Sequence, residues 1–163
     1  MMEEPITVRI ATLKVVSEPA VLVSRGLGSC VGVVLYEKGS GIAGMAHILL
    51  PSEEFSLKKD MPEKFADKAI EIMMDQMIQL GAIRSRIVAK IAGGARMFIS
   101  SAPMPERVHV GERNVQAVKK KLKEMNVPII AEDVGGTRGR TMEFDTKTGR
   151  VKIHLADKTV KVL

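Results

Sequence analysis

Two stretches of this 163-residue chain have the pattern of a strand, a tight turn and a second strand. In the first, the apolar runs VGVVLY and IAGMAHILL flank EKGSG, and in the second, alternating residues flank TKTG within RTMEFDTKTGRVKIHL. Glycine-containing turns between such runs indicate antiparallel hairpins. We therefore expect strands at about 30–36 and 42–50 and a second hairpin near the C-terminal end. These hairpins favour mixed or antiparallel pairing over a doubly wound parallel sheet.

Two segments have the apolar spacing of helices. The first follows a helix-start signature at Asp60 and Pro62 and ends at Gly81, and the second runs from about 112 to 125. Residues three to four positions apart give each helix one inward face. For the first helix these are Phe65, Ala69, Met73, Met77 and Leu80, and for the second Val115, Val118 and Leu122.

Shorter β-branched runs complete the predicted elements. They lie at 6–23, interrupted near Ser17 to Pro19, at 87–91 and at 127–131. The prediction is an α+β fold in which mixed or antiparallel β layers are covered by two main helices.

Length and composition favour one domain spanning residues 1–163. No apolar stretch approaches the roughly 20 residues of a membrane span, and the N-terminus is acidic where a secretory signal is basic. We therefore expect a cytoplasmic protein with no membrane insertion. A single cysteine, Cys30, forms neither an intramolecular disulfide nor a thiolate-rich zinc site.

The net charge of +6 makes an acidic partner plausible, and nucleic acid is the first to consider. However, basic residues alternate with acidic ones, and only 3% of the residues are aromatic and able to stack on bases. We expect no nucleic-acid partner.

The segment GLGSC, residues 26–30, has the features of a nucleophile turn. A glycine-rich turn before a strand can expose the thiol of Cys30, and the backbone N–H groups of Ser29 and Cys30 can face a developing oxyanion. If a two-residue turn at Lys38-Gly39 closes the hairpin, Cys30 lies directly opposite His47, which can then act as its base. Ser24 on the preceding strand is the candidate for a hydroxyl that orients the imidazole.

The same residues also fit a purely structural role. A lone cysteine beside an apolar run is more often a small buried hydrophobe, and a histidine among Met, Ala and Ile is more often an interior residue. His109 and His154 have no thiol nearby in the sequence and are expected at the surface. Gly93-Gly94 and Gly135-Gly136 match no phosphate-loop spacing and are expected to be structural turns.

A joint pattern of five ordered blocks favours the catalytic interpretation. They are GLGSC near 26–30, GMAHILLP at 44–51, KIAGGARMF at 90–98, GERNVQAVKKKL at 111–122 and AEDVGGTRGRTMEF at 131–144. Together they resemble the CheD family of chemoreceptor glutamine deamidases over nearly the whole chain. The resemblance implies that Cys30 is the nucleophile, that His47 is its base, and that Ser24 stands where the family has threonine.

The resemblance also implies a substrate and partners. The substrate would be a glutamine side chain in the cytoplasmic region of a methyl-accepting chemoreceptor, hydrolysed to glutamate during chemotaxis adaptation without a metal or organic cofactor. The fold would be similar to the catalytic domain of deamidating toxins, and the phosphatase CheC would be a binding partner. Three alternatives stay open: a catalytically idle protein that binds CheC or a receptor, a thiol amidase with another substrate, and, from the basic charge alone, an RNA-binding protein.

Overall fold

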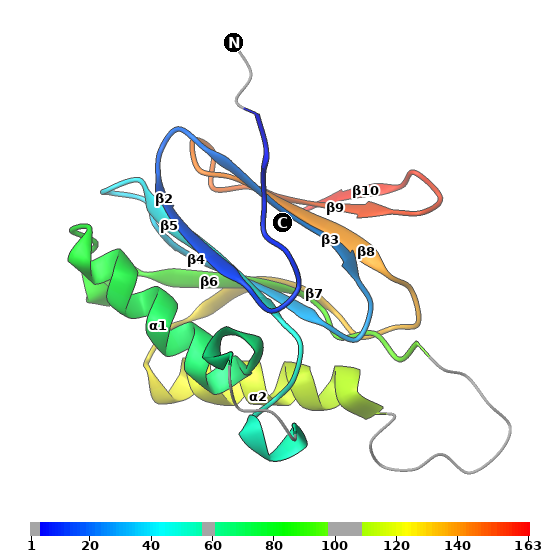
Figure 1. Ribbon diagram of the computed structural model, residues 1–163. Coiled ribbons are helices and arrows are strands. Elements are labelled where there is room, and N and C mark those ends of the chain that lie inside the picture. Colours follow the sequence, from blue (N-terminus) through cyan, green and yellow to red (C-terminus); the bar gives the residue numbers. More distant parts are fainter. Residues whose placement is uncertain (1–3, 57–60, 98–108) are drawn as a thin grey trace, which may run out of the picture.

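The computed structural model describes residues 4–56, 61–97 and 109–163 (Figure 1). The longer helices are α1 (Ala66–Gln79) and α2 (Val110–Glu124), and short 3-10 turns lie at Glu53–Phe55, Pro62–Lys64 and Arg84–Arg86. The strands are β1 (Ile6–Thr7), β2 (Leu13–Ser17), β3 (Val21–Leu27), β4 (Val31–Glu37), β5 (Ile42–Ile48), β6 (Val88–Gly93), β7 (Ile129–Val134), β8 (Arg140–Asp145), β9 (Val151–Leu155) and β10 (Val160–Val162).

The strands form two five-stranded sheets packed face to face, in the orders β1-β3-β8-β9-β10 and β2-β5-β4-β6-β7. Both helices lie on the outer face of the second sheet, below it in Figure 1. The second sheet is therefore the middle layer, and every residue of its central strands β4 and β5 is buried. This explains why their sequences are continuous apolar runs rather than alternating ones.

The predicted α+β class is confirmed, as are the antiparallel hairpins β4–β5 and β8–β9. Both sheets are mixed, because β1 pairs parallel to β3 and β6 parallel to β7, and their other strand pairs are antiparallel. The segment 6–23 contributes three strands, interrupted at Pro19 as expected and also between β1 and β2. Within the described ranges, the longest helices are too short and too polar to cross a membrane.

The first helix begins later than its sequence signature predicts. Asp60 lies outside the described residues, and α1 starts only at Ala66, because Phe65 is extended and fully buried. The backbone of this segment hydrogen-bonds to the end of the β5 segment: the N–H groups of Leu49 and Leu50 donate to Lys64, and that of Ala66 donates to Leu50. A tertiary β-bridge at Phe65 thus takes the backbone groups that a helical turn would use.

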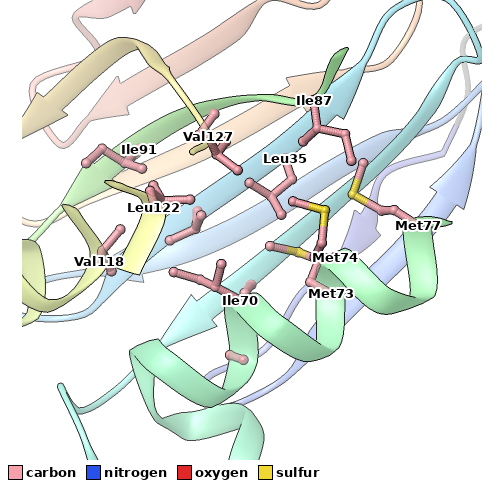
Figure 2. Close-up of a cluster of buried hydrophobic side chains, with 14 of the residues drawn as sticks. Leu35, Ile70, Met73, Met74, Met77, Ile87, Ile91, Val118, Leu122 and Val127 are labelled. Atoms are coloured by element: carbon pink, nitrogen blue, oxygen red, sulfur yellow. The ribbon is translucent and has the colours of Figure 1, made fainter. Parts of the chain in front are cut away.

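The methionines of α1 are core residues, as predicted. Met73, Met74 and Met77 are fully buried and meet Leu35 of β4 in the cluster between helices and sheet (Figure 2). The prediction was wrong for Leu80, which is 55% exposed because α1 has ended at Gln79 and the chain turns away at Gly81. The buried stripe includes Ile70 instead.

Candidate functional site

Cys30 and His47 lie on one face of the β4–β5 hairpin, but their predicted direct opposition is wrong. The turn has four residues, 38–41, rather than two, so the register pairs His47 with Gly32 and moves Cys30 to the diagonal position. A shift of two residues preserves the face of a strand. Diagonal neighbours are still within reach of a long or aromatic side chain.

The position opposite His47 has no space for a side chain, and the strand carries Gly32 there. A Cβ atom built at Gly32 would lie 2.7 Å from the Met142 sulfur and 3.1 Å from Leu27, both from the facing sheet. Side chains of the facing sheet therefore fill the space beside His47. The shared face of Cys30 and His47 is the one turned toward the first sheet, among residues such as Val34 and Met45.

Both groups are shielded from water, which keeps both neutral. Cys30 is 6% exposed and His47 is 1% exposed. Burial raises the pKa of the Cys30 thiol because it disfavours the thiolate. Burial also lowers the pKa of the His47 imidazole because it disfavours the cation, with a smaller opposing effect from the Val8 carbonyl. The resting pair is a thiol and a neutral imidazole, so the thiol requires a base to become a nucleophile.

The Val8 carbonyl determines which imidazole nitrogen can act as that base. His47 Nδ1 lies 3.4 Å from the Val8 oxygen. A carbonyl only accepts hydrogen bonds, so the proton belongs on Nδ1 and the lone pair on Nε2. Nε2 is buried and has no hydrogen-bond partner among the described residues, so it is available to accept a proton.

Ser24 acts on the same carbonyl and not on the ring directly. Its hydroxyl is fully buried and donates to the Val8 oxygen at 2.9 Å. Any influence of Ser24 on His47 therefore passes through Val8. The predicted orienting role stays a prediction, with this carbonyl as its route.

Replacing Ser24 tests that route. Ser24→Ala removes a buried hydrogen bond worth about 1 kcal/mol of unfolding free energy. We expect kcat to fall only a few-fold, because the Val8 carbonyl remains, and Ser24→Thr should keep kcat near the wild-type value. Steady-state kinetics with thermal unfolding of each variant measures this. Unchanged kcat in Ser24→Ala would remove the hydroxyl from the site.

The turn before β4 is held by two hydrogen bonds from the residues that follow β6. Gly94 N–H donates to the Cys30 carbonyl at 2.8 Å, and Ala95 N–H donates to the Gly28 carbonyl at 2.8 Å. At Gly93, where φ is +107°, an added Cβ would lie 2.3 Å from the Cys30 oxygen, so the β6 backbone approaches the Cys30 backbone as only glycine permits. Gly93 ends β6 instead of lying in a turn as predicted, whereas Gly94, Gly135 and Gly136 lie in the connections after β6 and β7, and all four have positive φ.

The N–H groups predicted to bind the oxyanion form no hydrogen bond with the described residues. Within the described residues, the hydrogen bonds leave the backbone N–H groups of Ser29 and Cys30 without an acceptor. Unpaired donors next to a nucleophile match the requirements of an oxyanion site. Their use in catalysis stays a prediction.

Asn114 is a site residue that sequence reasoning missed. It is fully buried on α2, and its Nδ2 donates to the Ser29 carbonyl at 2.9 Å and to the Leu49 carbonyl at 3.0 Å. One side chain thus links the nucleophile turn to the end of the strand that carries His47. A signal was present, because Asn114 continues the buried stripe of Val118 and Leu122 at four-residue spacing, and a polar residue there requires partners.

Replacing Asn114 should affect both stability and catalysis. In Asn114→Ala, the Ser29 and Leu49 carbonyls lose their donor, so we expect the free energy of unfolding to fall by about 1–3 kcal/mol. We also expect kcat to fall by at least about tenfold. Urea unfolding and steady-state kinetics measure the two effects, with Gln116→Ala on the exposed side of α2 as the control. A kcat equal to that of the control would show that Asn114 has no part in positioning the pair.

The other two histidines lie away from this pair. His154 is partly exposed, 4.0 Å from Glu143, in agreement with the surface prediction. His109, which precedes α2, has intermediate exposure like His154, and its Nδ1 atom is buried. Its backbone position at the start of a packed helix explains the burial.

Comparison with known proteins decides the family. The sequence profile described as "CheD chemotactic sensory transduction" matches residues 49–155, about two thirds of the chain. The chain belongs to the CheD family. The profile match begins after Cys30 and His47, so it includes Asn114 but not this pair.

Relatives extend the family likeness over the site. One, named chemoreceptor glutamine deamidase CheD in Halalkalibacterium halodurans, is 46% identical over 153 residues, covering 93% of this chain and 94% of the relative. Another, named probable chemoreceptor glutamine deamidase CheD in Clostridium botulinum, is 48% identical over 149 residues, covering 91% of both chains. The predicted family resemblance is confirmed.

The crystal structure of the Bacillus licheniformis hypothetical protein YfiH aligns with 74% of this chain and 49% of its own, at 16% identity and a TM-score of 0.45. That likeness is too slight to support an argument about the fold or the site. The predicted similarity to deamidating toxins stays a prediction.

Proposed function

We propose that this CheD-family chain hydrolyses glutamine side chains of chemoreceptors to glutamate, with Cys30 as nucleophile and His47 as base. The single observation that carries the mechanism is the buried, unpartnered Nε2 of His47 on the face that also carries Cys30. The relatives' names supply the reaction and the substrate class.

In the first half of the reaction, His47 Nε2 removes the thiol proton as Cys30 Sγ attacks the glutamine carboxamide carbon. The negative charge that develops on the amide oxygen is stabilised by the N–H groups of Ser29 and Cys30. The C–N bond then breaks, the proton held by His47 passes to the departing nitrogen, and ammonia leaves. A thioester joins Cys30 to the receptor side chain.

In the second half, water attacks the thioester. His47, neutral again after giving up its proton, removes a proton from the water and returns it to the Cys30 sulfur as the C–S bond breaks. The products are a glutamate side chain and the free thiol. The whole reaction uses side chains and backbone groups of this chain and consumes one water molecule, in its second half.

The test uses a receptor cytoplasmic fragment that carries glutamine at its modification sites. After incubation with the purified protein, mass spectrometry should find a gain of roughly one dalton at individual glutamines, the mass change of amide-to-acid hydrolysis. A fragment that stays unmodified while it still binds would contradict the proposal and favour a binding protein. Ammonia release from a non-receptor amide alone would point to a different amidase.

The protonation states predict how the thiol responds to pH. Because burial raises the Cys30 pKa, the thiolate is scarce at neutral pH, so alkylation by a small reagent should be slow there. Its rate should rise only above the ordinary thiol pKa of about 8.5. Stopped-flow alkylation between acidic and alkaline pH measures this. An inflection below neutral pH would instead indicate a preformed thiolate–imidazolium pair, contrary to the neutral pair described above.

We also propose a role and partners for this chain in the cell. The reaction takes place during chemotaxis adaptation, the cytoplasmic region of the receptor is the substrate, and CheC is a binding partner. A Cys30→Ala variant that restores signalling in a deletion strain would instead favour regulation by binding alone.

A further inference from the structure

We propose that a shallow depression beside His47 binds a carboxylate side chain of the polypeptide segment that carries the target glutamine. This inference rests on the proposed function and adds a specificity site to it. The depression has a volume of about 360 Å³, and its walls come from the chain between β1 and β2, from β3 and from the base itself. Its lining residues are Thr7, Val8, Arg9, Ile10, Arg25 and His47.

Two guanidinium groups give the depression its charge. Arg9 and Arg25 are exposed, and neither forms an ion pair with a described residue. Arg25 Nη1 donates to the Thr7 hydroxyl at 2.9 Å, which fixes the side chain and leaves the other donors of its fork unused. By contrast, Arg96, Arg138 and Arg140 each have a carboxylate partner.

The position of Arg25 follows from an irregularity in β3. The pairing of β3 with β8 shifts between Ser24 and Leu27, so Arg25 lies in a bulge rather than in the ladder. Bulges redirect side chains next to functional sites. Arg25 therefore stands at the rim, one residue from buried Ser24.

The chemistry of the depression fits an acidic peptide. A guanidinium binds a carboxylate in a planar, two-bonded geometry, and the exposed Ile10 can pack against the carbon stem of a glutamate. Phosphate would pair with the same groups, but the described lining of the depression contains no Phe, Tyr or Trp to stack a base. An acidic segment of a protein is therefore the favoured occupant.

The site is coupled to the reaction through His47, which is both lining residue and base. A carboxylate held here lies on the same segment as the glutamine at Cys30, so it fixes which glutamine enters. Charge attraction of this kind acts on the encounter and on binding rather than on the chemical step. The expected signature is a change in KM with kcat preserved.

The experiment pairs two enzymes with two fragments. The enzymes are the double variant Arg9→Ala/Arg25→Ala and the control Arg84→Ala/Lys147→Ala, which removes the same charge from exposed positions outside the depression. The fragments are the receptor fragment and a version in which glutamates flanking the target glutamines are replaced by alanine. Steady-state deamidation gives kcat and KM, and fluorescence anisotropy in a Cys30→Ala background gives the dissociation constant of each fragment.

We expect the Arg9/Arg25 variant to lose about tenfold or more in affinity and kcat/KM for the acidic fragment, with kcat unchanged. The control should stay close to wild type, and the alanine fragment should bind both enzymes equally weakly. Equal losses on both fragments, or an equal loss in the control, would overturn the proposal. So would Arg9- and Arg25-dependent binding of an oligonucleotide without any dependence on the fragment's glutamates.

The experiment distinguishes failure of the proposed function from failure of the proposed carboxylate site. If the wild type deamidates neither fragment, the proposed function is wrong, and the anisotropy measurements still decide whether the depression recognises carboxylates. If deamidation proceeds but ignores the arginines, the proposed function stands and the specificity site is wrong.

Discussion

Cys30→Ala should lower kcat for deamidation by at least about a thousand-fold, because no other thiol exists in the chain to form the thioester. The variant should still fold, since it removes one buried sulfur atom at a cost of about 1 kcal/mol in unfolding free energy. Ammonia release and fragment mass measure the activity. Anisotropy with the receptor fragment measures binding, which we expect to be preserved.

Cys30→Ser provides the matched control for size. A hydroxyl in this position has a far higher pKa than a thiol and stays protonated, so this variant should be as inactive as Cys30→Ala although it fills the space. Circular dichroism and thermal unfolding should match the wild type for both variants. Activity of either variant within tenfold of wild type would contradict the assignment of the nucleophile.

His47→Gln should lower kcat by about 10²–10⁴-fold, the usual contribution of a positioned general base. Gln retains an amide N–H for the Val8 carbonyl and much of the ring's volume, so the space between the sheets is not left empty. It has no nitrogen that accepts a proton near neutral pH. His154→Ala, at a partly exposed position on β9, is the control and should retain full activity.

The alkylation rate of Cys30 separates chemistry from misfolding in this variant. If His47→Gln is folded, the thiol should react with a small alkylating reagent at a rate within a few-fold of wild type, because the resting thiol is already neutral. Wild-type deamidation by His47→Gln would require a different base.

The hairpin shows how much of the site was readable from the sequence. The two apolar runs and the glycines between them predicted the strands, and the shared face of Cys30 and His47 was right because an even shift of register keeps a residue on the same face. The sequence did not determine the turn length, because EKGSG can form a two- or a four-residue turn. The structure has the four-residue turn, in a sheet where β4 also pairs with β6 and β5 with β2. The direct opposition was therefore wrong while the face was right.

The remaining differences come from contacts between distant segments. The Val8 carbonyl that meets His47 lies 39 residues away, in the connection after β1 that packs across the end of the hairpin. Phe65 leaves the helix for a bridge with Leu50, and Asn114 reaches two carbonyls from another layer. Local sequence patterns do not identify hydrogen-bond partners in distant segments. They indicate only that a polar residue in a buried stripe needs such a partner.

Because Cys30 is the only cysteine in the chain, a thiol reagent tests its role as nucleophile directly. A small methylthiolating reagent can block this thiol, and a reductant can then release it, while deamidation of the receptor fragment is followed throughout. If Cys30 is the nucleophile, activity falls in proportion to the labelled fraction and returns on reduction. Fully labelled protein that converts glutamine to glutamate at the wild-type rate would contradict this role.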